Sequence, residues 1–318
     1  MKIQQLEYVI AIAQAGSITS AAKNLYQAQP NISIALKELE SEIGMQIFWR
    51  TPNGMVLTPE GENFLIRAKD IVESMHTLES DYTNRINNNI PLKLASARSS
   101  YIASAVSEWV EKIRPENRIN ISILEVMTNN VIDCINSGKA DIGIIRIPKN
   151  QLDIYSEQLS NRKIAYRNLM SFYMKILIRS DNPLAKYDDI PFEELKNYIE
   201  IVHGDDEMNL FGRTFINKNY VNDENRNRIC VHDSGNKITM IDFIKNTYMW
   251  VSPSTLGNII SPDRLIVKKC SYANIEICDM IICKKSKENN RIVKSCTDFI
   301  TDYTREMHIN YKKRFNET

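Results

Sequence analysis

The chain has 318 residues, enough for two or three domains with their own cores. Its 40 Lys and Arg balance 39 Asp and Glu, so a net charge of +1 gives no general attraction to nucleic acid or to a membrane surface. No apolar run approaches the roughly eighteen residues that span a bilayer, and Met1 leads directly into an amphipathic helix rather than a signal segment. We therefore expect a soluble, cytoplasmic protein.

The N-terminal region predicts three short helices. The apolar spacing in residues 3–15 indicates the first, and residues 20–25 indicate a second with Ala21 and Ala22 on its inner side. Pro30 suits the first turn of a third helix, because its missing N–H needs no partner there. One apolar stripe runs along this third helix: Ile32, Leu36, Leu39 and Ile43.

The other face of the third helix carries Gln29, Asn31, Ser33, Ile34 and Lys37. Two interpretations are open. The helices could simply pack in an α-helical core, or they could form a helix-turn-helix whose second helix enters the major groove of DNA. In the second case Gln and Asn can pair bidentately with adenine, Ser is permissive, and Lys reaches guanine or phosphate.

The segment that follows favours the helix-turn-helix. Residues 47–50 and 55–58 predict two short strands around the turn Pro52-Asn53-Gly54, and this hairpin is typical of a wing. A long helix then runs from Pro59 to about residue 87. Its apolar residues are spaced like a coiled-coil seam: Phe64, Ala68, Ile71, Met75, Leu78 and Tyr82. The alternative is a helix packed on its own domain, but that domain is too small to cover the whole length, so the seam predicts a dimer.

Asn87-Asn88-Asn89 and Pro91 break the long helix and predict a hinge. Strand-like and helix-like segments alternate from there to residue 308, which indicates an α/β fold.

The order of helix, helix-turn-helix, wing and long helix resembles the N-terminus of LysR-type transcriptional regulators. The resemblance is carried at fixed spacing by Leu6, Tyr8, Gly16-Ser17-Ile18, Ala21-Ala22, Leu25, Gln29-Pro30, Ile32-Ser33, Leu39-Glu40, Gly44, Ile47-Phe48, Arg50, Leu57-Thr58 and Gly61. It extends over nearly the whole chain through Ala140-Asp141-Ile142-Gly143-Ile144 and Asn182-Pro183-Leu184-Ala185. So many matches form a specific signal.

The resemblance implies a winged helix-turn-helix at 1–58, a linker and dimerisation helix at 59–88, and an effector domain at 89–318. The effector domain would resemble a type 2 periplasmic binding protein, with lobe I at about 92–163 and 270–305 and lobe II at about 164–269. Further implications are a tetramer formed through the effector domains and RNA polymerase as an additional partner. No cofactor is implied.

The implied partner of the N-terminal domain is double-stranded promoter DNA. Its expected contacts are Lys23, Gln29, Pro30, Asn31, Ser33, Ile34, Lys37 and Arg50. Two departures from the family pattern bear on them: Ala28 replaces the usual Ser or Thr before the helix and is a poor N-cap, and Ile34 replaces a frequent Arg. Residues 1–90 hold seven Lys and Arg against ten Asp and Glu, a net charge of −3, so the prediction depends on the motif and not on a basic patch.

A small effector, expected to be an anion rather than a cation, is predicted in the cleft between the lobes. Ser99 and Ser100 follow a strand and begin a helix, where backbone N–H groups and the helix dipole attract carboxylates; capping of the helix is the simpler alternative. The expected effector contacts are Arg98, Ser99, Ser100, Thr128, Arg146, His203 and Ser234.

Other function classes find little support. His232-Asp233-Ser234 holds triad residue types, but consecutive residues of an extended segment point to opposite sides. His203-Gly204-Asp205-Asp206 lacks a second histidine at metal-ligand spacing, so we expect neither a metal site nor an enzyme. Two alternatives remain open: a redox sensor using Cys230, Cys270 or Cys278, and a ligand-binding module without gene-specific DNA binding.

Overall fold

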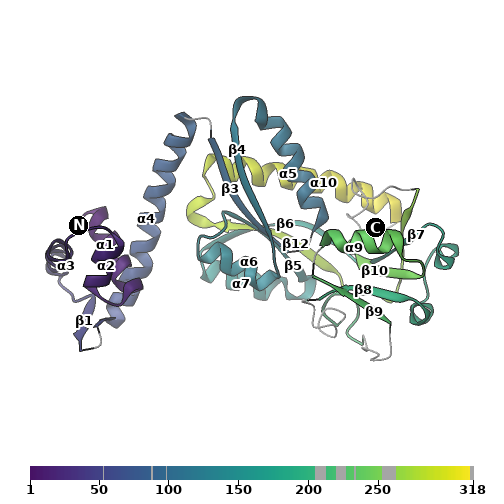
Figure 1. The fold of residues 1–318 in the computed structure, drawn as a ribbon, viewed down its shortest axis with the longest axis horizontal. Helices are drawn as coiled ribbons and strands as arrows, with labels where there is room; N and C mark the ends of the chain where they lie inside the picture. Colours follow the sequence, from purple (N-terminus) through teal and green to yellow (C-terminus); the bar gives the residue numbers. More distant parts are fainter. Residues whose placement is uncertain are drawn as a thin grey trace. The chain divides into compact units, whose positions relative to one another are not determined.

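The computed structural model describes residues 1–52, 54–86, 89–97, 99–204, 213–219, 227–232, 234–252 and 263–315. The chain divides into two compact units, Met1–Asn87 and Asn88–Thr318, and Figure 1 labels most of their helices and strands. No helix in the described part of the chain is long and apolar enough to cross a membrane.

The first unit contains three short helices, a hairpin and one long helix. These are α1 (Ile3–Ala15), α2 (Ile18–Asn24), α3 (Gln29–Ile43), β1 (Phe48–Thr51), β2 (Gly54–Leu57) and α4 (Pro59–Ile86). The Ser17 side chain caps α2 by accepting a hydrogen bond from the Ser20 N–H, which satisfies one of the free donors at a helix start. The turn before α3 passes through Tyr26, whose φ of 52° lies in the left-handed region.

The core of this unit lies between α1, α2 and α3. Ile32, Leu36 and Leu39 of the predicted stripe are 0–2% exposed and pack against α1 and α2. Ala21 and Ala22 are also buried, and their small side chains let the helices approach closely.

The hairpin β1–β2 is antiparallel, with Phe48 opposite Leu57 and Thr51 opposite Gly54. It is joined to the turn after α1, because the Met55 N–H donates to the Gly16 carbonyl over 2.8 Å. A Cβ at Gly54 would lie 2.4 Å from that carbonyl oxygen, and its φ is 123°, so only glycine fits there. The predicted wing is therefore present and fixed to the helices.

The second unit contains two five-stranded sheets. The first has the order β4 (Arg118–Glu125), β3 (Asn89–Ser96), β5 (Ile142–Pro148), β12 (Ile277–Lys284) and β6 (Ile164–Phe172). The second has the order β11 (Leu265–Lys268), β7 (Lys175–Arg179), β10 (Thr247–Val251), β8 (Ile199–His203) and β9 (Arg228–Val231). In each sheet three neighbouring strands are parallel, and antiparallel strands complete it.

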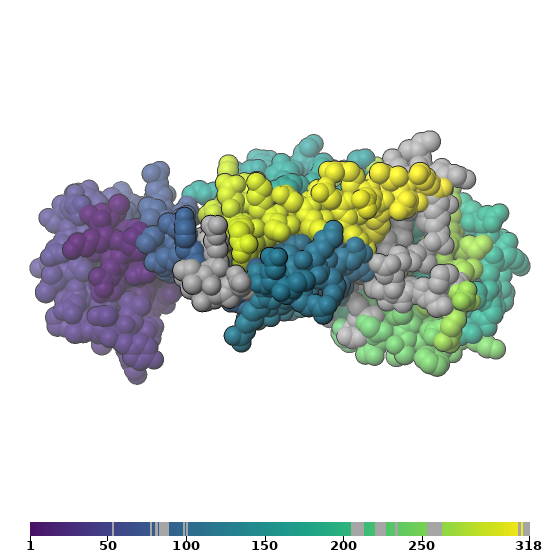
Figure 2. Space-filling model, turned by 90° about the horizontal axis from the view of Figure 1, so that it is seen from above, coloured from purple at the N-terminus to yellow at the C-terminus, as the bar shows by residue number. Residues whose placement is uncertain are grey.

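Helices cover both faces of the first sheet. They are α5 (Ser100–Ile113) and α10 (Arg291–Phe315) on one face, and α6 (Thr128–Asn136) and α7 (Leu152–Asn161) on the other. Alternation along the strands explains this division: Leu94 and Ile144 pack toward α5 and α10, while Ala95 and Ile145 pack toward α6. Figure 2 shows α10, in yellow, lying beside α5, in blue. The remaining described helix is α9 (Ser234–Phe243), which packs on the second sheet.

The described short 3-10 turns are Arg114–Glu116, Lys149–Gln151, Pro183–Lys186, Phe192–Asn197 and Lys285–Lys287.

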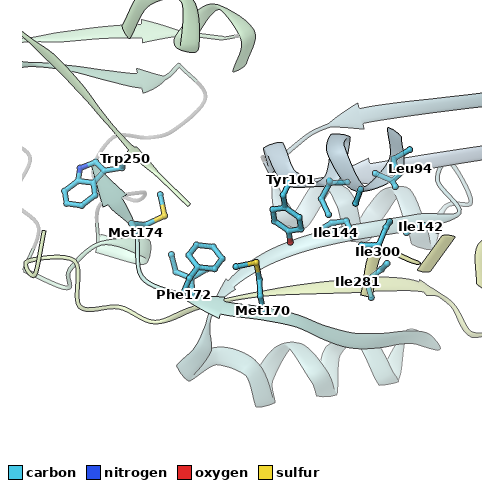
Figure 3. Packing of buried hydrophobic residues seen from close by; sticks show 14 of the residues in the cluster. Leu94, Tyr101, Ile142, Ile144, Met170, Phe172, Met174, Trp250, Ile281 and Ile300 are labelled. Carbon is cyan, nitrogen blue, oxygen red and sulfur yellow. The ribbon is translucent and has the colours of Figure 1, made fainter. Parts of the chain in front are cut away.

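One apolar cluster continues from the first sheet into the second. Tyr101, Ile144, Phe172, Met174 and Trp250 belong to it, as Figure 3 shows. Phe172 ends β6 and Met174 directly precedes β7, so the chain crosses between the two sheets inside this cluster. The two sheets are therefore parts of one folded unit.

The boundary between the lobes differs from the predicted one. It was expected at about residue 163, but β6 pairs along its length with β12 and so belongs to the first sheet. The second sheet begins with Lys175 in β7. The sequence also predicts a helix over residues 207–219, of which 207–212 lie outside the described residues.

Candidate functional site

The exposed face of α3 presents the residues expected to read DNA bases. Gln29, Pro30, Asn31, Ile34 and Lys37 are exposed, and Ser33 is half-buried. Because the opposite face is packed into the core, these side chains point away from the domain. Ile34, at 57% exposure, is an apolar side chain in a polar surface and could contact a thymine methyl group.

Three cationic side chains of the first unit are exposed: Lys23 on α2, Lys37 on α3 and Arg50 on β1. None of them forms an ion pair with another described residue. Their charges are therefore available for phosphate contacts.

Two contacts hold α3 against the wing, and one capping bond is absent. The Glu40 Oε1 atom accepts hydrogen bonds from the Ile47 and Phe48 N–H groups over 2.7 and 3.2 Å. At the start of α3, however, Ala28 makes no side-chain capping bond. The first turn of α3 is thus held by Pro30, by core packing and by the backbone bond from the Asn31 N–H to the Ala28 carbonyl over 3.0 Å.

The predicted seam of the long helix α4 has a buried part and an exposed part. Ala68 is 2% exposed and packs with Val72 against Leu6 of α1, and Phe64 also packs on its own domain. The rest of the seam is exposed: Ile71 at 43%, Met75 at 36%, Leu78 at 54% and Tyr82 at 62%. Four large apolar side chains along one line of a helix are an unusual surface for a monomer.

In the second unit, three of the expected effector residues meet in one buried polar cluster. The Arg146 Nη2 donates to the Ser99 Oγ over 2.8 Å, and the Thr128 Oγ1 donates to the Arg146 carbonyl over 2.8 Å. The cluster also contains two residues that were not predicted, Asp279 and Tyr101. Asp279 lies opposite Arg146 in the β5–β12 ladder.

Asp279 is the centre of this cluster. Its carboxylate is 0% exposed and accepts hydrogen bonds of 2.8 Å from the Arg146 Nε, the Arg146 Nη2 and the Tyr101 hydroxyl. The Arg146 guanidinium also lies 5.0 Å from the centre of the Phe172 ring. Arg146, one of the expected effector contacts, is therefore already neutralised inside the protein.

The electrostatics agree with a closed cluster. Burial lowers the pKa of Arg146, but the charge and hydrogen bonds of Asp279 more than offset it, so the pKa is raised. Burial, together with the charge of Asp279, raises the pKa of Tyr101 well above its usual value near 10. Arg146 thus stays charged and Tyr101 stays protonated as a donor at neutral pH.

The remaining expected effector residues lie elsewhere or are not described. His203 ends β8, is 5% exposed, and meets the His232 ring edge-on at 6.2 Å between ring centres. Ser100 and Ser234 are the first residues of α5 and α9. Arg98 lies outside the described residues, as do Asp205, Asp206 and Asp233 of the sequences considered for metal or triad chemistry. In the described ranges no group of three or more His, Cys, Asp or Glu side chains could hold a metal ion.

The three cysteines considered for redox sensing have different environments. Cys230 is exposed, whereas Cys270 and Cys278 are buried. Burial raises the pKa of both Cys270 and Cys278 to about 11, so their thiols are protonated and poorly reactive at neutral pH. This disfavours the redox alternative.

Thiol labelling checks this expectation. In the native protein iodoacetamide should modify Cys230 first, with half-buried Cys134 slower, while the four buried cysteines stay unmodified until the chain is denatured. Peptide mass spectrometry before and after unfolding reads this directly. Rapid modification of native Cys270 or Cys278 would reopen the redox interpretation.

Comparisons with known proteins match the N-terminal region to a family model. Residues 3–62 match the model of the bacterial regulatory helix-turn-helix protein, lysR family. The Hca operon transcriptional activator HcaR of Escherichia coli is 26% identical over 200 residues, covering 61% of this chain and 62% of HcaR. The HTH-type transcriptional regulator BsdA of Bacillus subtilis is 37% identical over 143 residues, covering 42% of this chain and 49% of BsdA. The chain thus spans about half to two thirds of the length of these relatives.

A solved structure extends the fold comparison to the whole chain. A full-length OxyR variant from Pseudomonas aeruginosa matches with a TM-score of 0.56 and 19% identity, covering 95% of this chain and 98% of OxyR. A helix-turn-helix unit followed by a two-sheet α/β unit is therefore the fold that this chain shares with full-length OxyR. Residues 3–62 therefore match the lysR family of bacterial regulatory helix-turn-helix proteins, which confirms the resemblance seen in the sequence.

Proposed function

We propose that this chain is a sequence-specific DNA-binding transcriptional regulator that acts as a dimer and responds to a small effector bound by its second unit. The observation that carries the proposal is the exposed face of α3 with Gln29, Asn31 and Lys37, together with the exposed Arg50 of the wing. Relatives such as HcaR are named as transcriptional regulators, which supports the same function here.

Substitutions in α3 test base reading. Gln29→Ala and Ser33→Ala should each weaken binding to the cognate site by about 1–3 kcal/mol, because each removes a side chain that can hydrogen-bond a base edge. Fluorescence anisotropy with labelled DNA from upstream of the protein's own gene measures this at several salt concentrations.

The matched control is Gln4→Ala, an exposed residue at the start of α1. The amino group of the neighbouring Met1 pairs with Glu42 near the end of α3, so Gln4 lies away from the start of α3. It should leave DNA affinity unchanged. Binding by the wild-type chain that is neither salt-sensitive nor sequence-selective would refute the proposal.

The second unit offers a surface for further self-association, as expected for a tetramer. Strand β4 is an edge strand, and its Ile123 and Leu124 are 50% and 51% exposed. Beside it, α5 and β4 line a groove of about 900 Å³ in which Val106, Val110 and Ile121 contribute apolar surface. An edge strand with exposed apolar residues supports pairing with a second copy of the chain.

A further inference from the structure

The second unit also contains a polar cavity that is open to solvent, unlike the buried Arg146 cluster. A cavity of about 670 Å³ lies between the end of β5, residues 217–219 and residues 274–276. It begins just beyond Arg146 and Asp279 in the β5–β12 ladder, where Pro148 pairs with Ile277. Two of its walls come from connecting segments, because 217–219 lie between β8 and β9 of the second sheet and 274–276 lead into β12 of the first.

The cavity carries a net positive charge. Lys149 and Glu276 form an ion pair of 2.7 Å at its wall and neutralise each other. Lys218 is exposed, and no described acidic residue pairs with it. One ammonium group is therefore available to an anion.

The remaining polar side chains are amides. Asn150, Asn219 and Asn274 are exposed, and their side chains make no hydrogen bond within the described structure. Each amide offers two donors and an acceptor oxygen, which suits hydroxyl groups because these also donate and accept. Ile275 is the one apolar side chain among the described lining residues, so the lining side chains suit a polar ligand.

The cavity walls are fixed before any ligand arrives. The Asn217 side chain is buried, donates to the Tyr272 carbonyl over 2.9 Å and accepts from the Asn219 N–H over 2.9 Å. The Asn274 N–H donates to the carbonyl of buried Ile216 over 2.9 Å. The Lys149 N–H donates to the Glu276 carbonyl over 2.8 Å. A preformed site loses little entropy on binding.

We propose that this cavity, and not the Arg146 cluster, binds the effector, and that the effector is a small hydroxyl-rich anion such as a sugar acid or sugar phosphate. Lys218 would pair with the anionic group, and the amides of Asn150, Asn219 and Asn274 would bind hydroxyls. The volume lies within the range of small-molecule sites in proteins. Assigning the ligand as an effector rests on the proposed function, whereas the binding itself does not.

Titration calorimetry on the full chain tests the proposal with four probes: gluconate and glucose 6-phosphate as hydroxyl-rich anions, glucose as a neutral polyol, and benzoate as an anion without hydroxyls. At least one of the first two should bind, and glucose and benzoate should bind at least about tenfold more weakly, because each lacks one of the two kinds of contact. Lys218→Ala and Asn274→Asp should weaken the binding by about tenfold or more. Lys139→Ala, a change at an exposed lysine outside the cavity, should not.

Binding that survives both cavity substitutions, or a benzoate affinity equal to that of gluconate, would overturn the proposal, and so would the absence of binding by every probe. DNA affinity is measured separately on the same protein. A chain that binds DNA but none of the probes contradicts this inference alone, whereas a chain that binds gluconate but no DNA contradicts the proposed function and supports the cavity.

Discussion

An Asp279→Asn variant is expected to lose about 3–5 kcal/mol of unfolding free energy, because it leaves the Arg146 guanidinium buried without its counter-charge. Arg146 is 12% exposed and Asp279 is 0% exposed, so water cannot replace the lost partner. The amide keeps one acceptor oxygen but lacks the negative charge of the carboxylate to which Arg146 and Tyr101 both donate hydrogen bonds. Urea denaturation followed by circular dichroism measures the change.

Asp298→Asn is the matched control for this prediction. Asp298 pairs with Arg167 over 2.6 Å, but the two side chains are 46% and 41% exposed, so the change should cost no more than about 1 kcal/mol. Replacing both buried partners, as Arg146→Met with Asp279→Leu, should recover much of the loss, because no buried charge remains. Equal losses in Asp279→Asn and Asp298→Asn would show that the cluster does not carry the stability assigned to it.

The polar cluster around Asp279 was only partly predictable from the sequence. Ser99, Thr128 and Arg146 were recognised because each follows or ends a predicted strand, and such positions meet at one edge of a parallel sheet. Asp279 lies in the apolar strand Ile277–Lys284, and nothing local in that sequence indicates a partner. A carboxylate within an otherwise apolar strand is itself the signal that would have found it, since a buried charge needs a partner.

The prediction of the fold also succeeded and failed for physical reasons. The helices of the first unit and the wing were predictable because periodicity, Pro30 and the glycine turn act locally. Strand β6 was not predicted. It is an edge strand of its sheet, and its polar residues Arg167, Asn168 and Ser171 hide the apolar alternation. Without β6, the boundary between the sheets was placed at 163 instead of after Phe172.

The second prediction with a large expected effect concerns dimerisation through α4. Ile71→Asp or Met75→Asp should convert the dimer to monomers at micromolar concentration, because a carboxylate would have to be buried in the apolar stripe of Ile71, Met75, Leu78 and Tyr82. Light scattering reads the mass directly. The affinity for a two-half-site DNA should fall about a hundredfold, since the two helix-turn-helix units would no longer be linked.

Ile66→Asp separates this prediction from a general loss of helix stability. Ile66 is 55% exposed, as accessible as the seam residues, but at about 100° per residue it lies on nearly the opposite side of α4 from Ile71. The same change of side chain there should leave the dimer intact. Because Ala68 and Phe64 already pack on the protein's own domain, the free seam begins at Ile71, and substitutions from there onward should act on association and not on folding. A monomeric wild-type chain, or dimer loss in Ile66→Asp equal to that in Ile71→Asp, would rule out the seam as the dimer contact.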